Sequence, residues 1–108
     1  MKVISLLAAA AAALAFSVPA VAADDAAATK AMKDNGCTKC HAVDKAKKGP
    51  AYQKIAAKYK GKADAEAKIS EFMTKSPKVK MDDGSEEEHK ALKDASQAKN
   101  LAQWILAQ

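Results

Sequence analysis

Apolar side chains recur every three or four positions along most of this chain, which is the spacing of helices with one buried face. The first such segment covers residues 24–35, and a glycine follows its last turn, where a helix commonly ends. The last covers residues 95–107 and places Leu101, Trp104 and Ile105 on one stripe. No stretch alternates apolar and polar residues as a half-buried strand does, so the pattern predicts an all-α chain.

Three further helices are predicted between these two. One begins at Pro50, which suits a first helical turn, and ends at Gly61. Another covers residues 63–74 and stops ahead of a proline. A short third covers residues 85–92, because Ser85-x-x-Glu88 is the signature of a capping box. The chain is therefore expected to fold as four to five helices joined by short loops.

The N-terminal segment has the composition of a secretory signal peptide. Lys2 supplies a positive start, residues 3–18 are apolar and rich in alanine, and Ala20-Val21-Ala22 is a small-residue cleavage site. A transmembrane anchor is the alternative, but an apolar run of about 15 residues is short for one and is followed at once by two aspartates. We therefore expect residues 1–22 to be removed, with cleavage after Ala22 or Ala23, and residues 23–108 to form one domain.

The pentapeptide Cys37-Thr38-Lys39-Cys40-His41 is the attachment signature of a c-type haem. Its two thiols can add to the haem vinyl groups as thioethers, and the histidine can place an imidazole nitrogen on the iron. A redox dithiol of the thioredoxin type would need a βαβ setting, which the pattern lacks. A zinc site would need two more cysteine or histidine ligands, and only His89 remains. A lone structural disulfide stays open as an alternative.

A mature chain of about 85 residues is long enough for one small domain with a marginal core. Aromatic residues make up only 5% of the sequence. A covalently held porphyrin would add a large apolar surface around which helices can pack. We therefore expect the chain without haem to be largely unfolded.

The chain resembles the class I cytochromes c, in particular their short bacterial electron-transfer members. The resemblance covers nearly the whole mature chain and rests on the order of its parts: an N-terminal helix, Cys37-Thr38-Lys39-Cys40-His41, Gly49-Pro50-Ala51-Tyr52, and a final helix ending Leu101-Ala102-Gln103-Trp104-Ile105-Leu106. It implies a small single-domain fold of helices wrapped around one covalently attached haem c. It also implies that the first and last helices cross, although the first lacks the family's usual aromatic residue. The residues expected to meet there are Ala28, Ala31 and Met32 with Leu101 and Trp104.

The resemblance also implies roles for four residues around the motif. Cys37 and Cys40 hold the haem as thioethers, and His41 is the proximal iron ligand. The carbonyl of Pro50 accepts a hydrogen bond from the ring of His41, which fixes the ring and strengthens its donation to iron.

Three side chains could supply the sixth iron ligand: Met73, Met81 and His89. Met73 lies in a predicted helix and suits a core position better, since methionine commonly fills gaps between packed side chains. Met81 agrees with the family's habit of using a methionine from the loop before the last helix. His89 agrees better with the family's spacing, because it lies 15 residues before Trp104, whereas Met81 lies 23 residues before it. We favour His89 slightly, with Met81 as a close competitor.

An iron with both axial positions filled suits electron transfer better than chemistry on a small substrate. Together with export, this predicts a periplasmic cytochrome that shuttles single electrons between redox partners and is not an enzyme. The alternative is a haem c sensor or a peroxidase-like protein whose sixth ligand can be displaced.

Charge is distributed unevenly along a chain whose net charge is +5. Lysines gather around the haem motif, and acids gather later: Lys39, Lys45, Lys47, Lys48, Lys54, Lys58, Lys60 and Lys62, then Asp82, Asp83, Glu86, Glu87 and Glu88. If the lysines ring the haem edge, they would steer the protein onto acidic docking patches of redox proteins. An exported chain without arginine is not expected to bind nucleic acid. We expect a monomer with no stable membrane insertion after signal cleavage.

Overall fold

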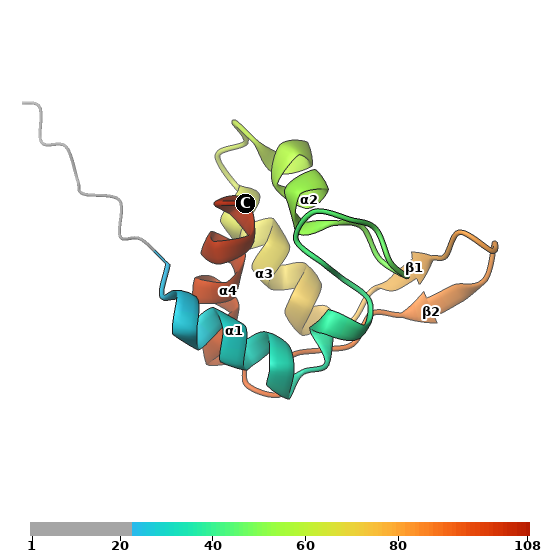
Figure 1. Cartoon of the computed structure of the whole chain (residues 1–108), viewed down its shortest axis with the longest axis horizontal. Helices are drawn as coiled ribbons and strands as arrows, with labels where there is room; N and C mark the ends of the chain where they lie inside the picture. The colour runs from blue at the N-terminus through green and yellow to red at the C-terminus, as the bar shows by residue number, and fades with distance from the viewer. Residues whose placement is uncertain (1–22) are drawn as a thin grey trace, which may run out of the picture.

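The computed structural model describes residues 23–108, and four of the five predicted helices are present in it (Figure 1). The elements are α1 (Asp25–Asp34), the 3₁₀ helix η1 (Cys37–Lys39), α2 (Tyr52–Tyr59), α3 (Ala65–Lys75), β1 (Lys78–Lys80), β2 (Glu86–Glu88), the 3₁₀ helix η2 (Ala95–Gln97) and α4 (Ala98–Leu106). The predicted signal peptide, residues 1–22, lies outside the described residues. Within residues 23–108, no helix is long and apolar enough to cross a membrane.

Helix α1 begins and ends at the residues that its capping signals predict. The side chain of Asp24 accepts a hydrogen bond from the amide of Ala27, which satisfies a donor in the first turn. Gly36 adopts a left-handed conformation with φ of 68° directly after the helix, and this turns the chain into η1. The first motif cysteine, Cys37, therefore follows three residues after the end of α1.

The core forms where α4 packs against the other three α-helices (Figure 1). Small residues let α1 and α4 approach closely, since Ala28 and Ala102 are both fully buried. Met32 and Leu101 belong to the same buried cluster, and Trp104 packs against it. The predicted crossing of the first and last helices is confirmed, with buried alanines on both helices.

Asn35 ties the end of α1 to the segment that leads into η2. It is buried, its amide group donates to the carbonyl of Ala31 at 2.7 Å, and its side-chain oxygen accepts from the amide of Lys93 at 2.9 Å. Sequence reasoning treated this position only as the end of a helix. The structure makes it the polar link between two segments 58 residues apart.

Replacing Asn35 with alanine is expected to lower the free energy of unfolding by about 2 kcal/mol, because it removes both hydrogen bonds of a buried side chain and leaves the Lys93 amide without this partner. Asn100→Ala is the matched control, since Asn100 bonds to the backbone of Asp24 at an exposed site. We expect the control to cost about 0.5 kcal/mol. Denaturant unfolding of both variants measures this difference, and equal losses would contradict the role given to Asn35.

The helix predicted over residues 85–92 is wrong, and so is the expectation that the chain lacks strands. Strands β1 and β2 form an antiparallel hairpin in which Lys78 pairs with Glu88 and Lys80 pairs with Glu86. Opposite charges across the strands favour this pairing over a helix that would carry three glutamates in succession. The serine of the supposed capping box instead bonds to Asp83 within the hairpin loop.

Candidate functional site

The motif cysteines and histidine lie on a single tight turn. The amides of Cys40 and His41 both donate to the carbonyl of Cys37, at 3.1 and 2.9 Å. Both cysteines are free thiols that line the same large cavity. Burial raises the pKa of the Cys37 thiol, and the nearby ammonium of Lys90 opposes that shift. The turn therefore presents two unpaired thiols and one imidazole to a common space.

The ring of His41 is held on three sides. Its Nδ1 lies 2.7 Å from the carbonyl oxygen of Pro50, the contact that the family resemblance implies. Tyr52 stacks on the ring with centroids 5.3 Å apart, and Gly49 lies against its other atoms. With Nδ1 donating to a carbonyl, Nε2 keeps its lone pair free for a metal.

Gly49 is required because its neighbour is the His41 ring and not because of its backbone angles. A Cβ added at Gly49 would lie 2.8 Å from Nδ1 and 2.9 Å from Nε2 of His41. These separations are too short for carbon against a ring that is itself held by Pro50 and Tyr52. Sequence reasoning quoted this glycine as part of the family pattern but gave it no role.

Gly49→Ala is therefore expected to displace the His41 ring, shift the reduction potential and cost about 1–3 kcal/mol of stability. Gly61→Ala is the control: it has a positive φ of 78° but no atom within 4 Å of an added Cβ. The control should lose stability through backbone strain and keep its potential. Redox titration and thermal unfolding separate the two effects, and an unchanged potential in Gly49→Ala would contradict the steric account.

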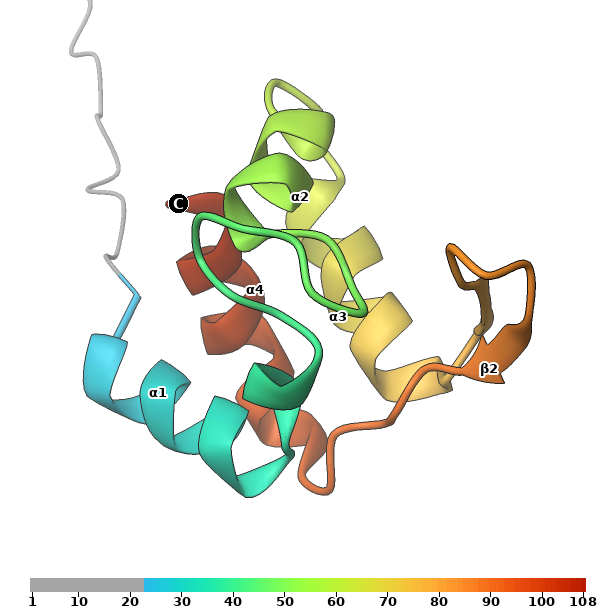
Figure 2. The ribbon, with the colours of Figure 1, turned by 45° about the vertical axis from the view of Figure 1, so that its right-hand side comes forward.

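The cavity that these residues face has a volume of about 670 Å³ and is lined mainly by apolar side chains. Helices α2, α3 and α4 supply its inner wall, and the hairpin closes one side. In Figure 2 the segment after η1 passes in front of α3 and α4 before it enters α2, and the hairpin stands beyond the end of α3. The apolar residues of the lining include Ile55, Ile69, Phe72, Met73, Leu92, Leu101 and Ile105.

His89 lies opposite His41 in this cavity. The two ring centroids are 6.2 Å apart, and the ring planes are inclined at 44°. Phe72 contacts the His89 ring edge-on at 4.8 Å, and the His89 amide donates to the carbonyl of Pro77 at 2.9 Å. Burial lowers the pKa of His89, as does the nearby His41, so the neutral ring with a free lone pair is favoured.

The other two candidates for the sixth ligand lie elsewhere in the lining. Met73 is buried in the helical core cluster, as its helical position predicts. Met81 lies at the far end of the hairpin, where its amide donates to Ser85, while His89 bonds to Pro77 at the base. Met81 follows Pro77 by four positions, which is about 13 Å at the usual rise of a strand. The hairpin therefore keeps Met81 and His89 at opposite ends of one surface.

Several unpaired lysines surround the same cavity. Within residues 23–108 the ion pairs are Lys30–Asp34, Lys68–Asp64 and Lys75–Glu71. None of these lysines lines the cavity, and the lysines that do are Lys48, Lys54, Lys58, Lys80 and Lys90. Within residues 23–108, three or more histidine, cysteine or acidic side chains nowhere lie close enough together to hold a metal ion.

Known proteins resemble this chain in both sequence and structure. A family model described as Cytochrome c matches residues 26–108. The crystal structure of the class 1 cytochrome MtoD from Sideroxydans lithotrophicus ES-1 is similar, with 49% identity and a TM-score of 0.76 over 80% of this chain and 97% of that one. Cytochrome c552 of Nitrosomonas europaea is 30% identical, with a TM-score of 0.63 over 73% of this chain and 96% of that one. Cytochrome c-551 of Pseudomonas aeruginosa is 32% identical over 71% of this chain and 72% of its own length.

Proposed function

The chain belongs to the cytochrome c family as a class I member, and from that premise we propose that it is a periplasmic carrier of single electrons whose haem iron is six-coordinate. As a member of this family it is a monohaem electron-transfer cytochrome with one covalently attached haem c and its iron. That iron supplies one-electron chemistry by cycling between the ferrous and ferric states. The protein's own contribution is to bind, orient and shield the group.

The residues of the first turn fit the covalent attachment of haem c. Cys37 and Cys40 are free and line one apolar cavity, so each thiol is available for a thioether bond. His41 follows them with Nε2 free, and the Pro50 carbonyl holds the opposite ring nitrogen. We therefore assign Cys37 and Cys40 to the thioethers, His41 to the proximal iron position and Pro50 to the orientation of His41.

The separation of the two histidine rings supports His89 as the sixth ligand and carries the proposal. A bond of about 2 Å and a further 1 Å or so to the ring centre put each imidazole centroid about 3 Å from a bound metal. Two opposed imidazoles on one metal are therefore about 6 Å apart, and His41 and His89 are 6.2 Å apart. Met81 also lines the cavity but stands at the other end of the hairpin from His89.

Two axial histidines leave no open iron position for a substrate, which supports a carrier over an enzyme, sensor or peroxidase. Reversible redox titration and carbon monoxide binding test this. We expect a reversible one-electron step and no carbon monoxide complex of the reduced protein at neutral pH. Rapid carbon monoxide binding would contradict six-coordination and favour the sensor or peroxidase-like alternative.

The proposed location and partners rest on charge and on the N-terminal sequence. Residues 1–22 have the composition of a signal peptide, and haem attachment through cysteines accompanies export. The excess of lysines over residues 45–63 suits acidic patches on redox proteins. Periplasmic fractionation of the native host and N-terminal sequencing of the purified protein test the location. An uncleaved N-terminus in a membrane fraction would contradict it.

A further inference from the structure

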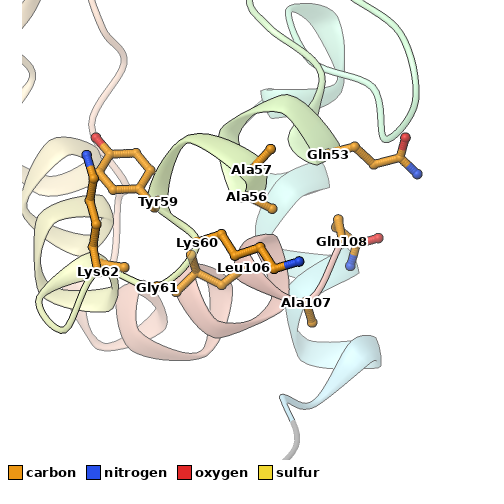
Figure 3. A pocket seen from close by; sticks show the side chains of 11 residues that line it. Gln53, Ala56, Ala57, Tyr59, Lys60, Gly61, Lys62, Leu106, Ala107 and Gln108 are labelled. Carbon is orange, nitrogen blue, oxygen red and sulfur yellow. The ribbon is translucent and has the colours of Figure 1, made fainter.

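A second hollow, of about 540 Å³, lies on the surface between α2 and the end of α4 (Figure 3). Alanines of α2 and Leu106 form its apolar part, and the chain after α2 supplies two exposed lysines. Figure 3 shows Tyr59 and Lys62 at one end and Gln53 and Gln108 at the other. An apolar centre with a polar rim is the usual anatomy of a protein-binding surface.

Tyr59 connects this hollow to the haem cavity. It is the one residue that lines both spaces among the described residues. Two ammonium groups lie over its ring, Lys58 Nζ at 5.6 Å and Lys62 Nζ at 5.5 Å from the centroid. Tyrosine presents a large, stiff contact surface at little entropic cost, which suits it to the centre of an interface. A partner seated in the hollow would therefore contact the side chain that borders the haem.

Lysines dominate the charge of this stretch of the chain. Residues 45–63 contain seven lysines and no acidic residue and lie between Asp44 and Asp64. Asp64 lies near Lys62 and is paired with Lys68 at 3.2 Å. Lys60 and Lys62, at the rim of the hollow, form no ion pair within the described residues. Such a surface attracts acidic proteins and repels basic ones.

We propose that the hollow is the docking site of an acidic redox protein and that Tyr59 lies on the electron path between that partner and the haem. This rests on the proposed electron-carrier function. One electron leaves the ferrous iron, which becomes ferric, and the one-electron acceptor of the partner is reduced. Tyr59 is not itself oxidised; its packed ring replaces solvent between the two centres.

Chemical-shift mapping locates the docking site directly. The labelled reduced cytochrome is titrated with the reduced, Cu(I) form of an acidic blue-copper protein, so that no electron moves. We expect the shifted amides to centre on residues 53–65 and 106–108. A footprint centred on the cavity mouth at Lys48 and Lys80 would overturn the proposal. So would the absence of any footprint with a blue-copper protein whose Cu(II) form accepts electrons from the cytochrome.

Charge reversal tests the same surface by rate. At low ionic strength, Lys60→Glu/Lys62→Glu should slow electron transfer to the Cu(II) protein by about tenfold. Two pairs serve as controls of equal charge change: Lys33→Glu/Lys99→Glu, in the last turn of α1 and the first turn of α4, and Lys48→Glu/Lys80→Glu at the cavity mouth. Equal slowing in all three would indicate net charge alone and overturn the proposal. A larger effect at the cavity mouth would do the same.

The path through Tyr59 is tested with two substitutions. Tyr59→Phe keeps the ring and should keep the first-order rate of electron transfer at saturating partner concentration. Tyr59→Leu should lower this rate several-fold and should weaken partner binding by a smaller factor. Equal rates in Phe and Leu variants of equal stability would overturn the role of Tyr59.

Oxidation by hexacyanoferrate(III), a small anion, checks the carrier function separately. Failure of the wild type there contradicts the proposed function, whereas normal oxidation with no protein docking contradicts only this inference.

Discussion

His89→Ala is expected to remove nearly all of the low-spin signal of the ferric protein. His89 faces His41 across 6.2 Å, the separation that two imidazoles on one iron require, and Phe72 holds its ring in place. Alanine cannot coordinate, so the iron should become high-spin with water or an empty site opposite His41. Electron paramagnetic resonance and the visible spectrum measure the change, and added imidazole should restore the low-spin form.

Met81→Leu is the matched control, because it removes a sulfur from the same hairpin and nearly conserves volume. We expect it to leave the spin state and the reduction potential nearly unchanged. Loss of low-spin iron in Met81→Leu, together with its retention in His89→Ala, would contradict bis-histidine ligation.

Cys37→Ala/Cys40→Ala is expected to yield a chain without a stable fold. The haem cavity measures about 670 Å³ and is bounded by α2, α3, α4, the hairpin and the loop after η1. Without haem, water enters it, and partly exposed apolar side chains such as Ile55, Phe72 and Leu92 lose the surface against which they would pack. Each such side chain contributes about 1.5–3 kcal/mol when fully buried, whereas the whole stability of a small domain is about 5–15 kcal/mol. Circular dichroism should show little helix and no cooperative unfolding transition.

Thr38→Ala is the control for this double substitution. Thr38 lies between the two cysteines and is exposed, so its side chain can be removed without touching the cavity. This variant should bind haem covalently and unfold cooperatively, within about 0.5 kcal/mol of the wild type. A cooperatively folded Cys37→Ala/Cys40→Ala chain without haem would show that the helices alone form a sufficient core.

The helical part of the fold was predictable because its signals are local. Asp24 and Gly36 bracket α1, and the stripe of Leu101 and Ile105 marks α4. Each signal acts within one or two turns, so neighbouring residues in the sequence carry it. The crossing of α1 with α4 follows from the small buried residues on both helices.

The hairpin was not predictable in the same way. Ser85 and Glu88 match a helix start, and nothing within residues 85–92 reveals that Glu88 pairs with Lys78 ten residues earlier. Strand pairing is a contact across the loop, and its energy is absent from any local window. The strands are also only three residues long, too short for alternation to be recognised.

The site residues likewise differ in whether neighbouring sequence or distant contacts place them. The attachment motif is contiguous, so Cys37, Cys40 and His41 can be proposed from the sequence alone. Spacing from Trp104 favours His89, and the structure places His89 6.2 Å from His41. Only the pairing of the strands places Met81 at the other end of the hairpin. The packing of Gly49 and Tyr52 around the His41 ring depends on a loop that folds back, which the sequence pattern does not encode.

The central claim is a six-coordinate haem c held between His41 and His89, and the optical spectrum of the purified protein tests it most directly. We expect a sharp α-band after dithionite reduction. We also expect the oxidised protein to lack the sulfur-to-iron charge-transfer band that a methionine ligand gives at the red edge of the visible range. That band, in an otherwise normal spectrum, would contradict His89 and identify Met81 as the ligand; the absence of any haem absorption would contradict the whole account.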